Sequence, residues 1–256
     1  MKIISFTGGY GAQIISAAAY FHLEKINTNN VGAYFGYFSQ TPHQAVPGVK
    51  NDISHWKWEM HNFGIKVDNF YQPTVNEKSE VVWDGPEKGE LGFSGLREPD
   101  IASKFIVSSE AVRYKKEMFG AESYACLHIR RGDYLNVASY LVSDEAFLRV
   151  TKKITKLVKN LLIVSDTPLN SILIQGLSAL NINCVTAIGG EPHLVHGLMR
   201  LSDILICSNS QFSLTAAALR DDSSLTLYPS QHDGEAQSYS NKFLSSIREF
   251  QIITML

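Results

Sequence analysis

Cysteine is scarce in this chain and shows no pairing pattern. The three cysteines, Cys126, Cys184 and Cys207, each lie in an apolar run typical of a strand, and none has a Cys-x-x-Cys partner. This spacing excludes a disulfide framework and a cysteine-based zinc or redox motif. We expect all three thiols to be buried, in a reducing compartment.

Long apolar runs and an excess of charge are also missing. No apolar stretch approaches the roughly 20 residues of a membrane-spanning helix, and the apolar start at 1–9 is too short for a signal peptide. The formal net charge of the 256 residues is −2, which argues against a nucleic-acid partner. We expect a cytoplasmic protein, at most peripheral at the inner face of a membrane. The sequence indicates no oligomeric state.

The chain contains no Asp-x-Asp pair. Paired carboxylates commonly hold a metal ion against substrate phosphates. Glu191, His193 and His196 could ligate a metal, but their spacing favours one face of a helix. We therefore expect no metal and no other cofactor, and charge on a bound phosphate would have to be met by arginine.

The second half of the chain alternates between apolar runs and helical patterns. Hydrophobic residues make up 45% of the chain, enough for one large domain or two small ones. Continuous apolar strands that alternate with helices predict a parallel sheet covered on both faces. The predicted strands are 123–129, 161–165, 182–188, 204–207 and 225–228, and the predicted helices begin near Ser143 and at Pro168 and span 192–201 and 213–220.

The first half repeats this alternation less regularly. The pattern predicts a strand over 2–6, a helix over 12–25 and a strand over 31–38, followed by a segment for which only a helix around 55–62 is predicted. A further helix over 108–119 ends at Gly120. We place the domain boundary there, which gives an α/β protein with domains 1–120 and 121–256.

One motif stands at the carboxyl end of the first strand of the second domain. Residues 128–134 are His-Ile-Arg-Arg-Gly-Asp-Tyr, and ligands of parallel sheets bind at that edge. An arginine fork neutralises a diphosphate through two charge-assisted hydrogen bonds, and Arg130 is the candidate. Adjacent side chains point to opposite sides, so Arg131 is expected to face elsewhere, and one of the two could pair with Asp133. The alternatives are an ordinary surface turn and an Arg-Gly-Asp adhesion motif, which lacks a secretory context.

Two other segments have a composition suited to phosphate. Residues 207–213, Cys-Ser-Asn-Ser-Gln-Phe-Ser, join a strand to a helix, where N–H groups attract anions. Simple N-capping by Asn209 or Ser210 would give the same sequence. Residues 7–13, Thr-Gly-Gly-Tyr-Gly-Ala-Gln, form a glycine turn, but Ile14 stands where a dinucleotide fingerprint needs its third glycine. The broken fingerprint argues against a dehydrogenase.

Together these three segments resemble the bacterial α-1,2-fucosyltransferases, glycosyltransferase family 11. The match to the family's His-x-Arg-Arg-Gly-Asp-Tyr motif is complete over 128–134, and 7–13, 164–166 and 207–213 are similar to its other conserved patches. The resemblance implies a glycosyltransferase-B-like fold of two Rossmann-like parallel-sheet lobes with a cleft between them. It implies an acceptor-side lobe over 1–120 and a nucleotide-sugar lobe over 121–256.

The resemblance also implies an activity and a set of site residues. The activity is metal-independent, inverting transfer of L-fucose from GDP-fucose to a galactoside hydroxyl of a glycan or lipid-linked saccharide. Arg130 would hold the β-phosphate and His128 would support the donor, and both are expected to be catalytic. The other residues expected to bind the donor are Arg131, Asp133, Asp166, Asn209, Ser210, Gln211, Phe212, Ser213, Gly8, Gly9, Gly11 and Gln13.

The chain departs from the family at several positions. Ala12 stands where the family has Asn, Gln211 replaces a Ser, and Val195 occupies the region where the family has an acid that binds guanine. These differences leave open a transferase of another GDP- or UDP-sugar and a non-catalytic nucleotide-binding protein. The sequence singles out no general base among Asp52, His55, Glu59 and Asp68, and Trp56, Trp58 and Trp83 suit either an acceptor platform or the core.

Overall fold

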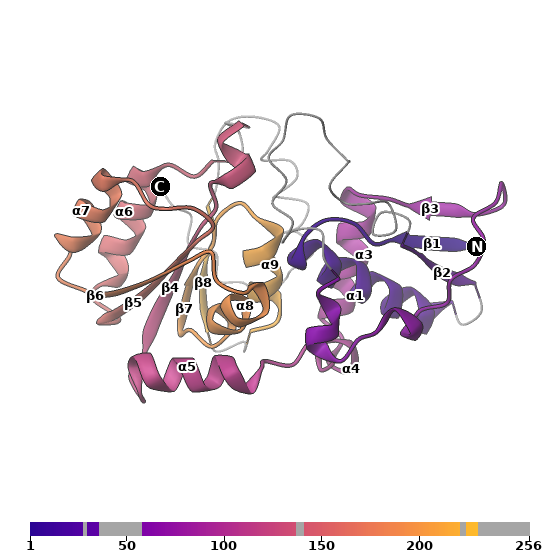
Figure 1. The fold of residues 1–256 in the computed structure, drawn as a ribbon, viewed down its shortest axis with the longest axis horizontal. Coiled ribbons are helices and arrows are strands. Elements are labelled where there is room, and N and C mark those ends of the chain that lie inside the picture. Colours follow the sequence, from indigo (N-terminus) through magenta and orange to yellow (C-terminus); the bar gives the residue numbers. More distant parts are fainter. Residues whose placement is uncertain (28–29, 36–57, 137–140, 221–223, 230–256) are drawn as a thin grey trace. The chain divides into compact units, whose positions relative to one another are not determined.

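A computed structural model describes residues 1–27, 30–35, 58–136, 141–220 and 224–229 (Figure 1). These residues divide into two compact units, of which unit 1 ends at Ile106 and unit 2 begins at Val107. The predicted boundary at residue 120 lies at the far end of helix α5 (Ser109–Phe119), which packs against α8 (Pro192–Arg200) of unit 2. The helix thus belongs with the second sheet rather than the first.

Unit 1 is built on a three-stranded parallel sheet in the order β2-β1-β3 (Figure 1). Its strands are β1 (Lys2–Ser5), β2 (Val31–Tyr34) and β3 (Glu80–Val82), and its helices are α1 (Tyr10–Ile26), α3 (Pro86–Leu96) and α4 (Pro99–Ala102), with 3-10 turns η3 (Met60–Phe63) and η4 (Val67–Asn69). The sequence predicted β1, α1 and the start of β2. Residues 36–38 of the predicted second strand and 55–57 of the predicted helix lie outside the described residues.

The sequence did not predict β3, α3 or α4. Helix α3 carries Gly89, Gly92 and Gly95, which weaken a helical pattern because glycine has low helix propensity. Packing against α1 explains Gly92 and Gly95. A Cβ at Gly92 would lie 2.5 Å from Ile15 Cγ2 and 2.6 Å from the Ile15 carbonyl oxygen, and one at Gly95 would overlap the Ala18 carbonyl.

Unit 2 is built on a five-stranded parallel sheet in the order β6-β5-β4-β7-β8. Its strands and their connecting helices alternate as the sequence predicted, with a short 3-10 segment after β4. The elements are β4 (Tyr124–Ile129), η5 (Gly132–Asn136), α6 (Asp144–Ile154), β5 (Asn160–Ser165), α7 (Ser171–Ser178), β6 (Asn183–Ile188), β7 (Ile204–Ile206), α9 (Gln211–Ala218) and β8 (Leu225–Leu227).

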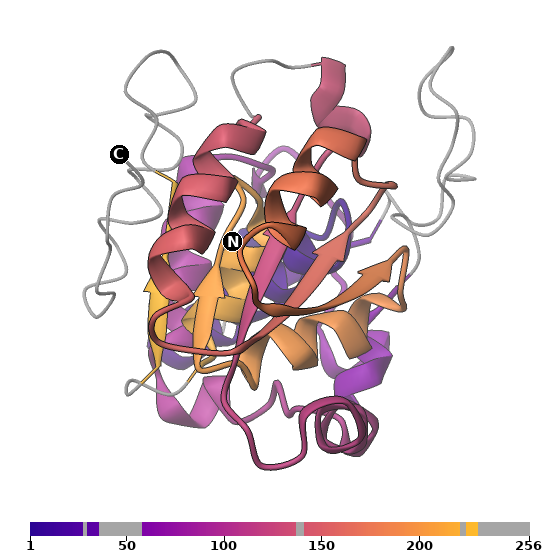
Figure 2. The same ribbon diagram turned by 90° about the vertical axis from the view of Figure 1, so that its left-hand side faces the viewer.

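Helices cover both faces of this sheet (Figures 1 and 2). On one face, the apolar side chains of β4 and β5 pack with Phe147 and Val150 of α6 and with Leu173 of α7. On the other face, Tyr124 stacks on Phe119 of α5, with ring centroids 4.6 Å apart, and its hydroxyl donates to the Leu198 carbonyl of α8. The predicted doubly covered sheet is confirmed.

Three details of the sequence prediction for unit 2 are wrong. Helix α7 begins at Ser171 rather than at Pro168, because Asn170 caps it by accepting from the Leu173 amide at 2.7 Å. Helix α9 begins at Gln211, two residues before the predicted start at 213. Cys126 and Cys207 are buried, but Cys184 is exposed, because β6 pairs with β5 alone among the described strands.

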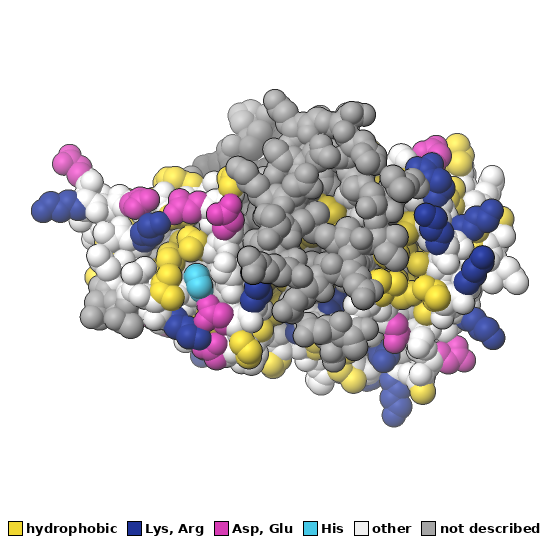
Figure 3. Space-filling view, turned by 180° about the vertical axis from the view of Figure 1, so that it is seen from behind, with side chains coloured by type: hydrophobic (Ala, Val, Ile, Leu, Met, Phe, Trp, Pro, Cys, Tyr) yellow, Lys and Arg dark blue, Asp and Glu magenta, His cyan; other side chains and the backbone are white. Residues whose placement is uncertain are grey.

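The described surface carries charges of both signs (Figure 3). Lysine and arginine side chains gather in the right-hand part of that view, and acidic side chains lie among basic ones in the left-hand part. Lys152 and Lys153 are exposed in the last turn of α6, where the helix dipole favours cations. None of the helices in the described ranges is both long enough and apolar enough to cross a membrane.

Because α1 and α3 approach closely, we expect alanine at position 92 to lower the stability of the protein, which is the opposite of its usual effect in a helix. In an open helix, Gly92→Ala would stabilise the protein by about 1 kcal/mol. Here the new methyl group meets the Ile15 backbone, so we expect the free energy of unfolding to fall by about 2 kcal/mol in urea titrations. The exposed Glu90→Ala on the same helix serves as the control and should change it little. A Gly92→Ala protein as stable as wild type would contradict this packing.

Candidate functional site

The strand order of unit 2 reverses beside β4. From β4 the chain runs outward to β5 and β6, and α8 then returns it to the other side of β4, where β7 and β8 follow. Ligands of open parallel sheets bind in the crevice outside the carboxyl ends of the strands at such a point. The carboxyl ends of β4 and β7 carry the two predicted motifs, 128–134 and 207–213.

His128 joins these two strand ends. Its Nδ1 lies 2.8 Å from the Ser208 hydroxyl, and its ring lies 5.5 Å from that of Phe212, which in turn lies 5.5 Å from His196. Burial, and secondarily the nearby Arg130, lowers the pKa of His128 to about 3. Burial therefore favours the neutral imidazole of His128 at pH 7.

Arg130 is held over the carboxyl ends of β4 and β5. Its Nη1 lies 3.0 Å from Asp166 Oδ2, its guanidinium lies 5.4 Å from the Tyr134 ring centroid, and its side chain is 16% exposed. Asp166 also accepts the Arg131 amide at 2.8 Å. Gly132 permits this arrangement, because a Cβ there would lie 2.5 Å from Asp166 Oδ2. Asp166 therefore lies beside the motif and positions Arg130, and the donor binding that the resemblance implies for Asp166 stays a prediction.

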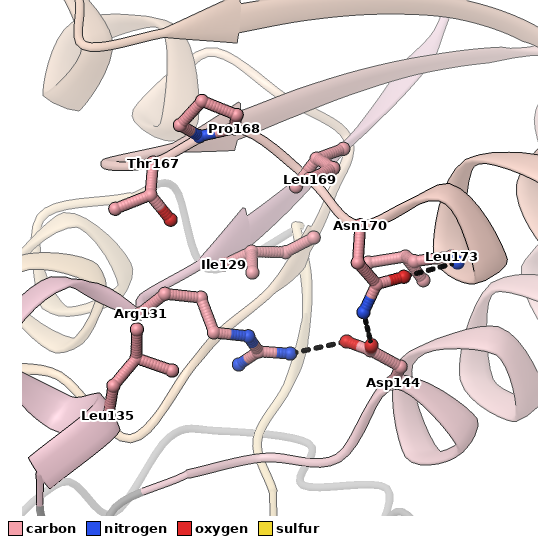
Figure 4. A pocket seen from close by; sticks show the side chains of 9 residues that line it. All are labelled: Ile129, Arg131, Leu135, Asp144, Thr167, Pro168, Leu169, Asn170 and Leu173. Atoms are coloured by element: carbon pink, nitrogen blue, oxygen red, sulfur yellow. Dashed lines mark hydrogen bonds and ion pairs between the residues drawn. The ribbon is translucent and has the colours of Figure 1, made fainter.

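Arg131 faces a different set of side chains, as expected for adjacent residues. Its Nη2 lies 2.5 Å from Asp144 Oδ1 at the start of α6, and Asn170 donates to the other oxygen of the same carboxylate (Figure 4). Arg131, Asp144 and Asn170 line a pocket of about 180 Å³ together with Ile129, Leu135, Thr167, Pro168, Leu169 and Leu173. Among the described carboxylates, Asp166 pairs with Arg130 and Asp144 pairs with Arg131, and the side chain of Asp133 lies outside the described part.

The loop after β7 is fixed mainly by its own polar side chains. Ser210 caps α9 by accepting from the Phe212 amide at 3.3 Å, and Asn209 accepts from the Tyr228 hydroxyl at 2.8 Å. Ser213 is fully buried and donates to the carbonyls of Ser208 and Ser210. N-capping is therefore confirmed for Ser210 and not for Asn209. Ser213 is turned into the protein, whereas Gln211 and Phe212 are partly exposed, and donor binding by these residues stays a prediction.

The glycine turn of unit 1 links β1 to α1. Gly8 has a φ of +74°, Gly9 caps α1 and Gly11 is buried in its first turn. Gln13 is fully buried, donates to the Gly8 carbonyl at 3.0 Å and accepts the Glu59 amide at 2.9 Å. Gln13 therefore stabilises the turn, and donor binding by this segment stays a prediction.

The remaining sequence candidates have separate surroundings. His196 is buried with Nε2 at 3.2 Å from the Thr215 hydroxyl, and His193 lies 3.8 Å from Glu110. No group of three His, Cys, Asp or Glu side chains suited to a metal occurs among the described residues. Of the four candidate bases, Asp52 and His55 lie outside the described residues, as does Trp56. Glu59 is buried, Asp68 is exposed, and Trp58 packs against Phe6 and Phe35.

The chain has two α/β units, each built on a parallel sheet, and this is the glycosyltransferase-B-like fold. No protein-family model and no curated protein matches the chain. Among solved structures, the apo form of POFUT1 aligns with a TM-score of 0.50 and 12% identity, covering 89% of this chain and 97% of its own. A glycosyl transferase family 9 protein from Veillonella parvula DSM 2008 aligns with a TM-score of 0.50 and 8% identity, covering 99% of this chain and 84% of its own. At these identities the likeness shows the fold.

The neutral, buried His128 predicts a loss of stability in weak acid. An unfolded histidine has a pKa near 6.5, and the folded pKa is about 3, so protons favour the unfolded state as pH falls below about 6.5. At pH 5 this costs about 2 kcal/mol, and His196 acts in the same direction. His128→Asn retains a polar side chain but cannot titrate.

We expect His128→Asn to lose about 2 kcal/mol less than wild type between pH 7 and pH 5, measured by urea unfolding at both pH values. The two proteins share every other titrating group, so the difference isolates His128. Equal losses in the two proteins would show that the imidazole is not buried in its neutral form.

Proposed function

We propose that the chain is a metal-independent, inverting glycosyltransferase that moves L-fucose from GDP-fucose to a galactoside hydroxyl, forming an α-1,2 linkage on a glycan or lipid-linked saccharide. The observation that carries this proposal is the placement of Arg130. It lies at the carboxyl end of β4, next to the reversal of strand order, and Asp166 holds its guanidinium in position.

The chemistry of sugar transfer accounts for an arginine there. The bond between the sugar C1 and the β-phosphate oxygen breaks, and negative charge builds on the departing diphosphate. A preorganised guanidinium stabilises that charge through short, charge-assisted hydrogen bonds. The acceptor oxygen attacks C1 from the opposite face, which inverts the anomeric carbon.

His128 acts by positioning in this proposal. Its hydrogen bond to Ser208 ties the end of β4 to the loop before α9, and Phe212 packs on its ring. Both contacts fix the edge of the sheet where the diphosphate would lie. Since the imidazole is neutral, the positive charge comes from Arg130.

The choice of donor rests on two further points. The 128–134 motif resembles that of α-1,2-fucosyltransferases, and POFUT1, whose apo form shares the fold, has also been solved in complex with GDP-fucose. The position near which the family has its guanine-binding acid carries Val195, which is buried. Assays with GDP-fucose, other GDP-sugars and UDP-sugars therefore decide the donor, and preference for another sugar would overturn the fucose assignment.

Replacement of Arg130 tests the role of the guanidinium fork. Arg130→Lys keeps the charge but loses the bidentate geometry. We expect it to lower kcat for donor turnover by roughly 100-fold or more, measured as GDP release from GDP-fucose with and without lactose. The melting temperature should stay close to that of wild type.

The matched control is Arg149→Lys on the exposed face of α6, which should leave turnover unchanged. If Arg130→Lys or Arg130→Ala retained wild-type turnover, Arg130 would not be the phosphate-binding group. A wild-type protein that binds GDP but turns over no nucleotide sugar would instead be a non-catalytic nucleotide-binding protein.

A further inference from the structure

A second charged cluster occupies the carboxyl edge of the sheet in unit 1. Thr7 follows the end of β1 by two residues, and Asp84 follows the end of β3 by two residues. The Thr7 hydroxyl donates to Asp84, 2.7 Å from Oδ1 and 2.9 Å from Oδ2. The cluster therefore lies where α/β sheets bind ligands.

Lys88 holds this cluster from its buried side. Its side chain is 4% exposed, and its ammonium group donates to the Ser5 carbonyl at 3.1 Å, to Thr7 Oγ1 at 3.1 Å and to Asp84 Oδ1 at 2.5 Å. These three bonds use its three protons. Burial lowers the pKa of Lys88, against the opposing effect of Asp84.

This lysine is costly for the fold in two respects. A buried ammonium loses its hydration, and Lys88 is the third residue of α3, where the helix dipole disfavours a cation. Residues that break such rules commonly serve a site. A tie between the two turns would account for a partner carboxylate on Lys88, but it does not require that this carboxylate reach into water.

Asp84 does reach into water. Its side chain is 66% exposed, while its anchor Lys88 is almost fully buried. The neighbouring Trp83 is 54% exposed, and its ring meets that of Tyr34, at the end of β2, edge-on with centroids 5.4 Å apart. Trp83 and Asp84 follow β3 where the chain bends, so the alternation of a strand does not run through them, and both exposed side chains belong to this edge.

We propose that Asp84 and Trp83 form a pyranose-binding site that takes the acceptor sugar of the proposed transferase. The assignment of the sugar as acceptor rests on that proposed function, whereas the binding of a pyranose does not. A carboxylate accepts hydrogen bonds from two neighbouring hydroxyl groups, and an indole covers the apolar C–H face of the ring. Lys88 and Thr7 are positioning residues that fix the carboxylate.

The test uses the full-length protein and direct binding. Methyl β-D-galactopyranoside and the methyl glycosides of glucose, mannose and fucose are titrated while the indole N–H resonance of Trp83 is followed by NMR. The resonance is assigned by its loss in Trp83→Ala. We expect a saturable shift for at least one glycoside, and a Kd raised about tenfold or more in Asp84→Asn and, measured by calorimetry, in Trp83→Ala.

Two variants in the same unit serve as matched controls. Glu90→Gln removes an exposed carboxylate of α3, and Tyr71→Ala removes an aromatic side chain that is 62% exposed. Both should bind the glycoside as wild type does. Asp84→Asn should also leave the affinity for GDP-fucose unchanged, which separates sugar binding from donor binding.

The outcomes distinguish this site from the proposed function. If no glycoside shifts the Trp83 resonance, or if Asp84→Asn and Trp83→Ala bind as tightly as wild type, the sugar site is wrong even where donor turnover is intact. If the shift and its loss in both variants are seen without any transfer, the sugar site stands and the transferase proposal falls. A higher KM for lactose in both variants, with an unchanged KM for GDP-fucose, would support both.

Discussion

A largely buried guanidinium requires a carboxylate beside it, and this requirement organises the ligand edge of unit 2. Arg130 and Asp166 follow neighbouring strands, and their side chains are 16% and 17% exposed. Removing such charges from water is expensive unless they are paired. Asp166 also receives the amide of Arg131, and Gly132 leaves room for it. The loop after β4 is therefore held in one geometry before any ligand binds, which is the condition for electrostatic catalysis.

Unit 1 uses the same kind of pair, but its two partners are unequally exposed. There the cation, Lys88, is 4% exposed, and the carboxylate, Asp84, is 66% exposed. A buried cation under an exposed carboxylate presents hydrogen-bond acceptors, which suit hydroxyl groups, whereas a guanidinium presents donors, which suit phosphate. Under the proposed function, the edge of unit 2 would take the diphosphate and the edge of unit 1 the sugar hydroxyl groups.

The sequence predicted those parts of the structure that depend on local pattern and on strand order. Apolar runs predicted the strands of unit 2, and the rule that ligands gather at carboxyl strand ends brought 128–134 and 207–213 to one edge. The same rule could have singled out Ser208, the second residue after the end of β7 and part of that segment. The rule could not predict the contacts of Asp144 and Tyr228 with this edge, because those contacts depend on how a helix and a distant segment pack. Helix α3 was missed because its glycines serve its contact with α1, and glycine is read locally as a helix breaker.

The two histidines beside Phe212 are neutral, so they add no positive charge to that of Arg130. Protonated imidazoles would add positive charge near the carboxyl ends of β4 and β7, but burial lowers the pKa of both His128 and His196, so neither is charged at neutral pH. Arg131 forms an ion pair with Asp144 and lines the pocket beside α6 and α7. Both arginines are ion-paired and 16% exposed, but Arg131 faces the pocket beside α6 and α7, so Arg130 is the cation that we propose for a diphosphate. The diphosphate of a nucleotide sugar does not titrate between pH 6 and 8, and neither histidine of this cluster changes its charge in that range. Affinity for such a donor should then depend on guanidinium geometry rather than on pH.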